Sequence, residues 1–98
     1  MKTLSGKQRQ FLKGIAHALS PIVRVGKGGV TESVIAETRK SLESHELIKV
    51  RIEVDESAER KSLAERLATA TDAHLAGTIG KIAILYRERD EEPAIRLP

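Results

Sequence analysis

The sequence predicts a small α/β protein in which three helices pack against a mixed four-stranded sheet, in the order α-β-α-β-α-β-β. Apolar residues recur with a helical period in three segments, and short β-branched runs alternate with these segments. Gly80-Lys81 separates the last two runs, as in a tight hairpin. Strand–helix–strand units imply parallel pairing, whereas the hairpin adds an antiparallel pair. We expect residues 1–98 to form a single domain.

The first helix is predicted to begin at a capping box formed by Ser5 and Gln8 and to run to about Leu19. Pro21 then ends the helix and biases Ser20 towards an extended conformation. The next run, Pro21 to Val25, is β-branched and is expected to be a strand inside the sheet. The helical period assigns the following residues to the core: Leu4, Phe11, Leu12, Ile15, Ala16 and Leu19.

The second helix is expected from about Val30 to Ser44, with Thr31 as its N-cap or next to it. The strand from Leu47 to Val54 alternates strictly and should have one wet face. Asp55 or Ser57 is predicted to cap a third helix from about Ala58 to Ala73. The remaining strands are expected at residues 74–79 and 82–87, and residues 93–98 are expected to form an extended edge or tail. The buried faces of the two helices are predicted to be Val34, Ile35, Thr38 and Leu42, and then Leu63, Ala64, Leu67, Ala68 and Thr71.

Composition excludes several classes of protein. The chain contains no cysteine, so disulfides and cysteine-based zinc or redox sites are ruled out. No apolar run approaches the roughly 20 residues of a membrane helix, and the N-terminus does not resemble a signal peptide. We therefore expect a cytoplasmic protein that does not contact membranes. Phe11 and Tyr86 are the only aromatic residues, which excludes an aromatic platform that stacks several bases.

Charge is distributed unevenly along the chain. The net charge is only +3, but residues 1–31 hold six basic residues and no acidic one. These are Lys2, Lys7, Arg9, Lys13, Arg24 and Lys27, whereas residues 52–98 contain more acids than bases. A segment of one sign favours a surface that faces a polyanion. The alternative is a solvated helix face that is basic by chance.

The segment from Gly26 to Gly29, Gly-Lys-Gly-Gly, is the strongest candidate for a binding loop. A strand-to-helix turn explains one or two glycines, but not three glycines and a lysine in an acid-free region. Thr31 stands where a dinucleotide motif needs glycine, and Gly28 follows Lys27 where a Walker A loop needs Ser or Thr. What remains is a Gly-x-x-Gly clamp for a nucleic-acid backbone, with helix N–H groups and a lysine as phosphate ligands.

The candidate RNA-binding residues extend beyond this loop. Lys7, Lys13 and His17 form a stripe on the first helix, and Lys49 and Arg51 lie on the wet face of the long strand. The complete predicted set is Gly26, Lys27, Gly28, Gly29, Thr31, Lys7, Lys13, His17, Arg24, Lys49 and Arg51. The sequence provides no nucleophile, metal cluster or paired carboxylates at a recognisable spacing, so we expect neither catalysis nor a cofactor. Gly77 to Gly80 also fits Gly-x-x-Gly, but it lies between strands and is interpreted as hairpin geometry.

Several stretches together resemble the CRM domain, named for chloroplast RNA splicing and ribosome maturation, in its stand-alone bacterial YhbY-type form. They are residues 12–17, Pro21, residues 25–32, the His-Glu-Leu-Ile-Lys-Val segment at 45–50, residues 79–81 and residues 85–87. The pair formed by the glycine loop and the segment at 45–50 is specific at this separation. The resemblance covers essentially the whole chain, and it maps the family's RNA-binding loop onto Gly26 to Gly29 and its basic first helix onto Lys7 and Lys13. Arg24 is a departure, because an apolar residue is expected in that strand.

The resemblance implies a fold similar to the C-terminal domain of bacterial translation initiation factor three. It also implies a protein that binds RNA and associates with precursors of the large ribosomal subunit. We expect this protein to be non-enzymatic and monomeric. No small-molecule substrate is implied. Two alternatives stay open on the residues alone: a protein-interaction module whose basic face is incidental, and a small nucleotide-binding enzyme.

Overall fold

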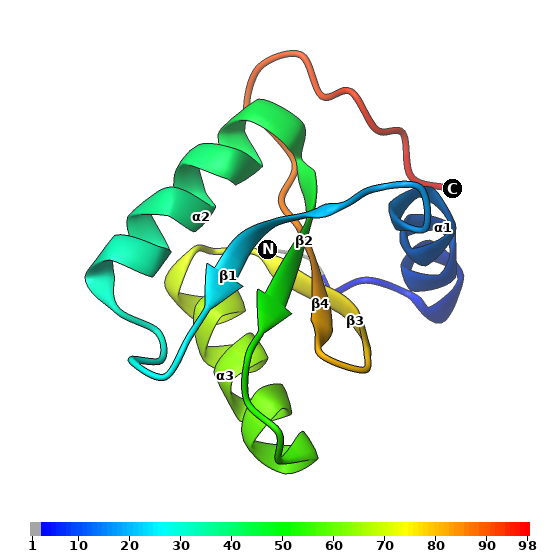
Figure 1. The fold of residues 1–98 in the computed structure, drawn as a ribbon. Coiled ribbons are helices and arrows are strands. Elements are labelled where there is room, and N and C mark those ends of the chain that lie inside the picture. The colour runs from blue at the N-terminus through cyan, green and yellow to red at the C-terminus, as the bar shows by residue number, and fades with distance from the viewer. Residues whose placement is uncertain (1–2) are drawn as a thin grey trace.

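The computed structural model describes residues 3–98. Figure 1 shows the helices and strands in the predicted order. The helices are α1 (Gly6–Ala16), α2 (Glu32–His45) and α3 (Ser57–Ala70). The strands are β1 (Pro21–Val25), β2 (Leu47–Ile52), β3 (His74–Ile79) and β4 (Ile82–Tyr86). The predicted fold class is therefore confirmed. Within residues 3–98, no helix has the length and apolar character needed to cross a membrane.

The four strands form one mixed sheet in the spatial order β1-β2-β4-β3. β1 and β2 are parallel, whereas β4 is antiparallel to both β2 and β3. The hairpin places β4 in the interior, next to β2, and this leaves β1 at one edge. The prediction that Pro21 to Val25 lies inside the sheet is wrong. Its β-branched residues do not all face a core, because Val23 and Val25 are buried while Ile22 is 46% exposed.

The larger core lies between the sheet and helices α2 and α3. The alternation along β2 directs Ile48, Val50 and Ile52 to this side, where Leu42 and Leu67 complete the packing. The predicted buried face of α3 is confirmed, and Thr38 and Leu42 of α2 are fully buried. Val34 and Ile35 are half-buried at the margin of the same core. Because aromatic residues are absent here, aliphatic side chains and alanines fill the space between the helices and the sheet.

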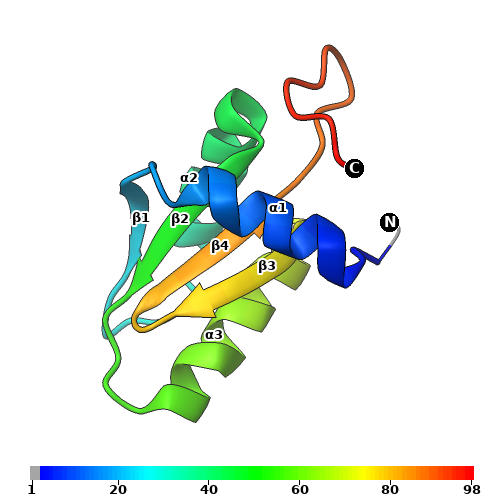
Figure 2. The ribbon, with the colours of Figure 1, turned by 90° about the vertical axis from the view of Figure 1, so that its right-hand side faces the viewer.

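Helix α1 covers part of the opposite face of the sheet, as Figure 2 shows. The second core contains Leu12 and Ala16 of α1, together with Leu47, Ile84 and Tyr86 from the strands. Leu4 and Ala76 are also buried there, and Ile95 and Leu97 of the C-terminal segment pack against them. The sheet is therefore enclosed on both faces, but the second face is covered by a single helix.

The structure corrects the extent and the core face of the first helix. The capping box is present, with Gln8 N donating to Ser5 Oγ at 3.1 Å, but the helix ends at Ala16 rather than near Leu19. Phe11, Ile15 and Leu19 were expected in the core and are instead exposed by more than a third. A single helix lying across a sheet buries only a narrow stripe, and Leu12 and Ala16 occupy that stripe.

The third helix is capped by a residue that the sequence did not suggest. Glu56 is the N-cap, and its carboxylate accepts hydrogen bonds from the N–H groups of Ala58 and Glu59 at 3.1 and 2.7 Å. Asp55 instead forms an ion pair with Lys81, and Ser57 is the first helical residue. A carboxylate at this position also favours the positive end of the helix. The helix ends at Ala70, three residues before the predicted end.

The C-terminal segment is held by a buried carboxylate. Glu46 is 0% exposed, and its side chain accepts hydrogen bonds from the backbone N–H groups of Arg89, Ala94 and Ile95 at 2.8, 2.7 and 2.9 Å. Burial acts to raise the pKa of Glu46, but these three donors and the charge of Arg89 outweigh it and lower the pKa. Residues 93–98 are therefore a tail, as predicted, but a tail that is fixed to the core.

Replacing Glu46 by Gln should reduce the free energy of unfolding at neutral pH by about 2 kcal/mol, because the donors lose a charged acceptor. A lowered folded-state pKa means that the ionised carboxylate stabilises the fold above its ordinary value of 4.5, and that this contribution is lost as the pH falls below it. Urea unfolding of both proteins at several pH values should show the difference shrinking in acid. Glu43→Gln, at an exposed position of α2, is the matched control. A difference that is independent of pH would contradict this account.

Candidate nucleic-acid interface

The segment from Gly26 to Gly29 forms a tight turn between β1 and α2. The N–H of Gly29 donates to the carbonyl oxygen of Gly26 at 3.0 Å, so that Lys27 and Gly28 occupy the tip of the turn. Gly29 has φ +74°, and its carbonyl then accepts a hydrogen bond from the N–H of Thr31 at 3.1 Å. Thr31 is the N-cap of α2, and its Oγ1 accepts from Val34 N at 3.2 Å. The predicted turn directly before a capped helix is therefore present.

The three loop glycines differ in what the fold requires of them. Gly29 adopts a left-handed conformation that a residue with a side chain rarely takes. Gly26 and Gly28 do not have a positive φ, and a Cβ at Gly26 would have no atom within 4 Å. A Cβ at Gly28 would make only an ordinary contact, 3.6 Å from Thr31 Cγ2. Backbone conformation therefore accounts for one glycine, and the other two expose bare backbone to solvent.

The loop presents hydrogen-bond donors that have no partner within residues 3–98. These are the N–H groups of Lys27 and Gly28 at the tip and those of Glu32 and Ser33 in the first turn of α2. The Gly29 N–H, in contrast, is used by the turn itself. The start of a helix adds partial positive charge, and the exposed ammonium of Lys27 adds a full one. Such a group of donors can bind a phosphate, with Glu32 as a nearby negative charge that weakens the attraction.

Arg24 and Arg51 are brought together on the side of the sheet that α1 covers in part. They are paired neighbours in the β1–β2 register, and Arg24 lies two residues before the loop. Glu53 lies between them, and its Oε1 is 3.3 Å from Arg24 Nε and 3.1 Å from Arg51 Nε. The trio therefore carries a net charge of only +1. The sequence placed Glu53 on the same wet face as Arg51, but gave no sign that it would pair with both arginines.

Lys49 has a structural partner. Its ammonium donates to the carbonyl oxygen of Leu19 at 2.9 Å, and the residue is half-buried. This hydrogen bond ties β2 to the connection between α1 and β1, and it satisfies a carbonyl just beyond the end of α1. Lys49 is therefore less available to an external anion than Arg51 or Lys27.

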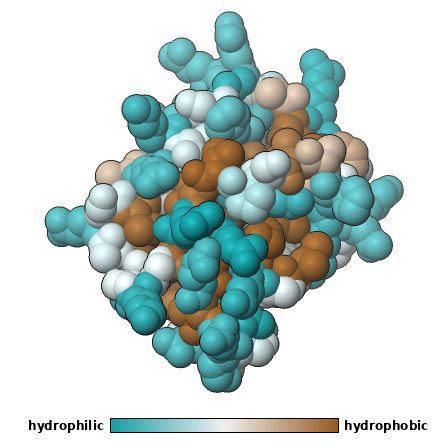
Figure 3. Space-filling view, in the orientation of Figure 1, coloured by the Kyte–Doolittle hydropathy of each residue, from teal (hydrophilic) through white to brown (hydrophobic). Residues whose placement is uncertain are grey.

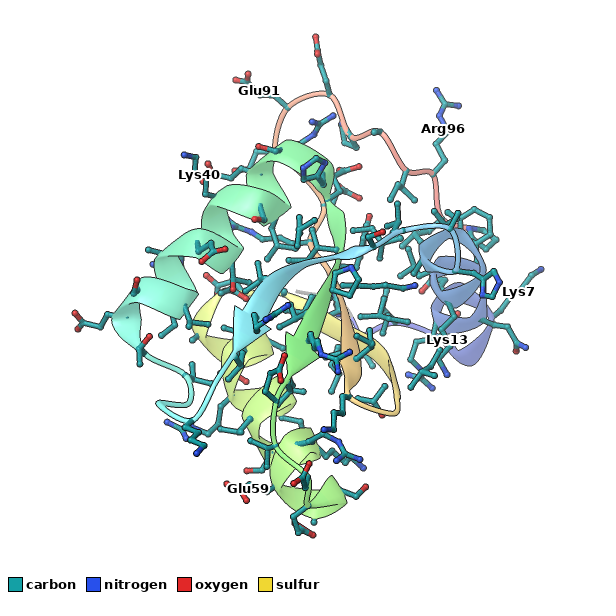
Figure 4. The ribbon with its side chains drawn as sticks, viewed as in Figure 1. Lys7, Lys13, Lys40, Glu59, Glu91 and Arg96 are labelled. Carbon is teal, nitrogen blue, oxygen red and sulfur yellow. The ribbon has the colours of Figure 1, made fainter. Side chains whose placement is uncertain are left out.

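Of the remaining predicted residues, Lys7 and Lys13 are exposed on α1, and His17 is exposed at the C-cap, one residue beyond the helix. Figure 4 shows Lys7 and Lys13 on this helix, well separated from the turn between β1 and α2. The predicted site therefore has two parts, the loop and the helix, with Arg24 and Arg51 on the sheet face next to the loop. Lys2 belongs to the basic segment but lies outside the described residues. Figure 3 shows the side of the molecule that faces the viewer in Figure 1, and hydrophilic side chains gather over its centre and its lower part.

Gly77 was interpreted as hairpin geometry, and the structure gives it a different place. It lies inside β3, next to a register shift, rather than in the turn. A Cβ at Gly77 would overlap the Cε of Lys13 and would lie 3.2 Å from its Nζ. Gly77 is therefore what allows the side chain of Lys13 to lie flat across β3. Sequence alone could not find this contact, because it joins residues that are 64 positions apart.

The fold is a small α/β domain with one helix on one face of the sheet and two on the other. A Gly-x-x-Gly loop joins its first strand to a capped helix. The chain belongs to the CRS1/YhbY (CRM) domain family, which it matches over residues 4–87.

Several relatives cover nearly the whole chain. A Haemophilus influenzae protein named RNA-binding protein is 45% identical over 98 residues, which are 100% of this chain and 98% of the relative. The probable RNA-binding protein YqeI of Bacillus subtilis is 41% identical over 97% of this chain and 99% of its own length. A Staphylococcus aureus protein with a solution structure is 41% identical, covers 98% of this chain and 100% of its own, and superposes with a TM-score of 0.88. The names of these relatives describe no enzymatic activity.

Gly29→Ala should destabilise the fold by about 1 kcal/mol, because alanine is strained at φ +74°. For a domain of this size, that corresponds to a fall in melting temperature of about 4–8 °C. Gly26→Ala and Gly28→Ala should leave the melting temperature within about 2 °C of the wild type, since neither position is crowded or left-handed. Calorimetry of the three variants distinguishes the glycine that folding needs from the two that it does not. Equal losses in all three would contradict the assignment.

Proposed function

We propose that this protein binds RNA through its backbone phosphates and acts, without catalysis, in maturation of the large ribosomal subunit. The observation that carries the proposal is the loop from Gly26 to Gly29. It combines free N–H donors, an exposed lysine and two glycines that packing does not require. Bare backbone in front of a helix lets a phosphate approach closely. The RNA-binding names of the relatives support RNA as the polyanion.

The binding surface has a centre and an extension in this proposal. Lys27 and the N–H groups of Lys27 and Gly28 hold one phosphate, and Arg24 and Arg51 contact the adjacent backbone. Lys7 and Lys13 on α1, with His17 at its C-cap, extend the surface. Thr31 and Gly29 act by shaping the loop, and Lys49 contributes mainly through its hydrogen bond to Leu19. Contacts of this kind position RNA without reading its sequence.

The ribosomal part of the proposal rests on the family. Stand-alone members resemble this chain over its full length, and the resemblance implies that precursors of the large subunit are the particles bound. We infer that the RNA partner is large-subunit ribosomal RNA in such precursors. A protein-interaction module is the competing function, and it predicts no affinity for RNA at low salt.

Lys27→Ala should weaken RNA binding and reduce its dependence on salt. If about four phosphates are contacted, log K should fall against log salt with a slope near −3, at roughly 0.7 per contact. The slope of Lys27→Ala should be shallower by about 0.7, because one phosphate contact is lost. Gly28→Ala should lower the affinity for RNA about tenfold with the slope unchanged, because it fills space at the loop but removes no charge. Lys40→Ala, at an exposed position farther along α2, removes the same charge away from the loop and is the matched control.

Fluorescence anisotropy with a ribosomal RNA fragment measures these slopes. Identical slopes and affinities for Lys27→Ala and Lys40→Ala would eliminate the loop as the phosphate site. Sucrose-gradient sedimentation of cell extracts with the same variants tests the ribosomal partner. The wild type and Lys40→Ala should travel with precursor large subunits, and Lys27→Ala should remain near the top of the gradient.

Gly77→Ala should weaken RNA binding by displacing Lys13, although residue 77 carries no charge. The added methyl group meets the end of a flexible side chain, so the melting temperature should change little while the ammonium moves away. Its effect on affinity should match that of Lys13→Ala, and the double variant should be no worse than either single one. Additive losses in the double variant would show that Gly77 acts independently of Lys13.

A further inference from the structure

A cavity of about 970 Å³ lies at the end of the sheet opposite the glycine loop. Its walls come from the start of α1, the turn between α3 and β3, the end of β4 and the C-terminal tail. Tyr86 ends β4 and pairs with Leu47 at the start of β2, whereas the loop follows the carboxyl end of the parallel strand β1. Figure 1 shows the tail passing from the end of β4 over to α1, on the far side of the sheet from the loop. None of the residues proposed above to contact phosphate lines this cavity.

Tyr86 lines the cavity and carries a hydroxyl group that the fold does not use. The residue is 2% exposed, and its Oη is one of two buried side-chain N or O atoms without a hydrogen-bond partner in residues 3–98. Burial and the nearby carboxylates of Glu46 and Glu88 raise the pKa of Tyr86, so the hydroxyl stays protonated. A buried donor without a partner costs stability, and phenylalanine would pack equally well. The hydroxyl therefore points to a partner that binds here.

His74 adds a second ring to the same cavity. Its ring centroid is 6.2 Å from that of Tyr86, and the two planes are inclined by 21°. Burial lowers the pKa of His74, so at neutral pH the ring is uncharged and offers one donor and one acceptor. Two nearly parallel and uncharged rings suit a flat heterocycle better than an ion.

The other lining residues restrict which ligands the cavity can hold. Leu4, Ile95 and Leu97 provide apolar surface, and Gln8 provides an amide. Asp72 and Glu88 also line the cavity, and Arg87 and Arg96 balance their charges. Arg87 is half-buried at the end of β4, and its guanidinium has no ion-pair partner in the described chain, so it is free to contact a phosphate attached to the heterocycle. The volume lies within the range of small-ligand sites.

We infer that this cavity holds a nucleobase, bound between the aromatic pair at His74 and Tyr86 and the tail. The Tyr86 hydroxyl, the His74 ring nitrogens and the Gln8 amide pair with the edge of the base, and Arg87 contacts its phosphate. Such a base comes from an RNA strand or from a free nucleotide. The inference goes beyond the phosphate-binding loop and does not depend on it, because the two sites lie at opposite ends of the sheet.

Nuclear magnetic resonance of the full chain tests the inference with the four nucleoside 5′-monophosphates and with short single-stranded RNA oligonucleotides. At millimolar concentration, the monophosphates should shift the signals of His74, Tyr86 and Ile95. Tyr86→Phe should bind about fivefold to tenfold more weakly with a melting temperature no lower than that of the wild type, because it removes a buried donor without a partner. Lys27→Ala should bind like the wild type. Stronger shifts with the oligonucleotides identify RNA as the source of the base, and shifts with monophosphates alone identify a free nucleotide.

Arg87→Gln provides a second variant that leaves the aromatic pair intact. It should weaken binding of adenosine 5′-monophosphate but not of adenosine, since only the phosphate contact is removed. Three results would overturn the inference. They are no shift at the cavity with any probe, shifts confined to Lys27 and Gly28, and a Tyr86→Phe protein that binds as the wild type does.

Discussion

The arrangement of the molecule depends on the two-sided packing of strand β2. Because successive side chains of a strand point to opposite faces, Ile48, Val50 and Ile52 are buried under α2 and α3, and Leu47, Lys49 and Arg51 face the side of α1. α1 is short and covers only the part of that face near Leu47. The opposite end of the same face keeps Arg51 at the surface beside Arg24. The alternation that builds the cores thus also places basic side chains next to the loop.

A second constraint comes from Glu46, which joins α2 to β2. It has φ +61°, which is unusual for a residue with a side chain, and its carboxylate is completely buried. Burying a carboxylate is costly unless hydrogen bonds compensate, and three backbone N–H groups of the C-terminal segment do so. The same bonds fix the tail that forms one wall of the cavity at Tyr86. Glu46 therefore links the stability of the fold to the position of the tail that lines the cavity.

The glycines show how the fold and the proposed function share a small number of residues. Gly29 satisfies a backbone requirement of the turn, Gly26 and Gly28 leave the backbone open, and Gly77 makes room for Lys13. The first two roles depend only on the local backbone and its exposure to solvent, whereas the role of Gly77 depends on a side chain that is distant in the sequence. In the proposed function, these glycines let the loop bind repeated backbone phosphates without aromatic side chains.

Local sequence determined the elements, because capping, periodicity and turn chemistry act over a few residues. The capping box at Ser5, the N-cap at Thr31, the alternation of β2 and the hairpin at Gly80 all followed from near neighbours. Tertiary structure decided whatever depends on distant partners. It placed β1 at the edge, left Phe11 and Ile15 exposed, and joined Lys13 to Gly77 and Glu46 to the tail. Periodicity shows which side of an element is apolar, but only the assembled sheet decides how much of that side is covered.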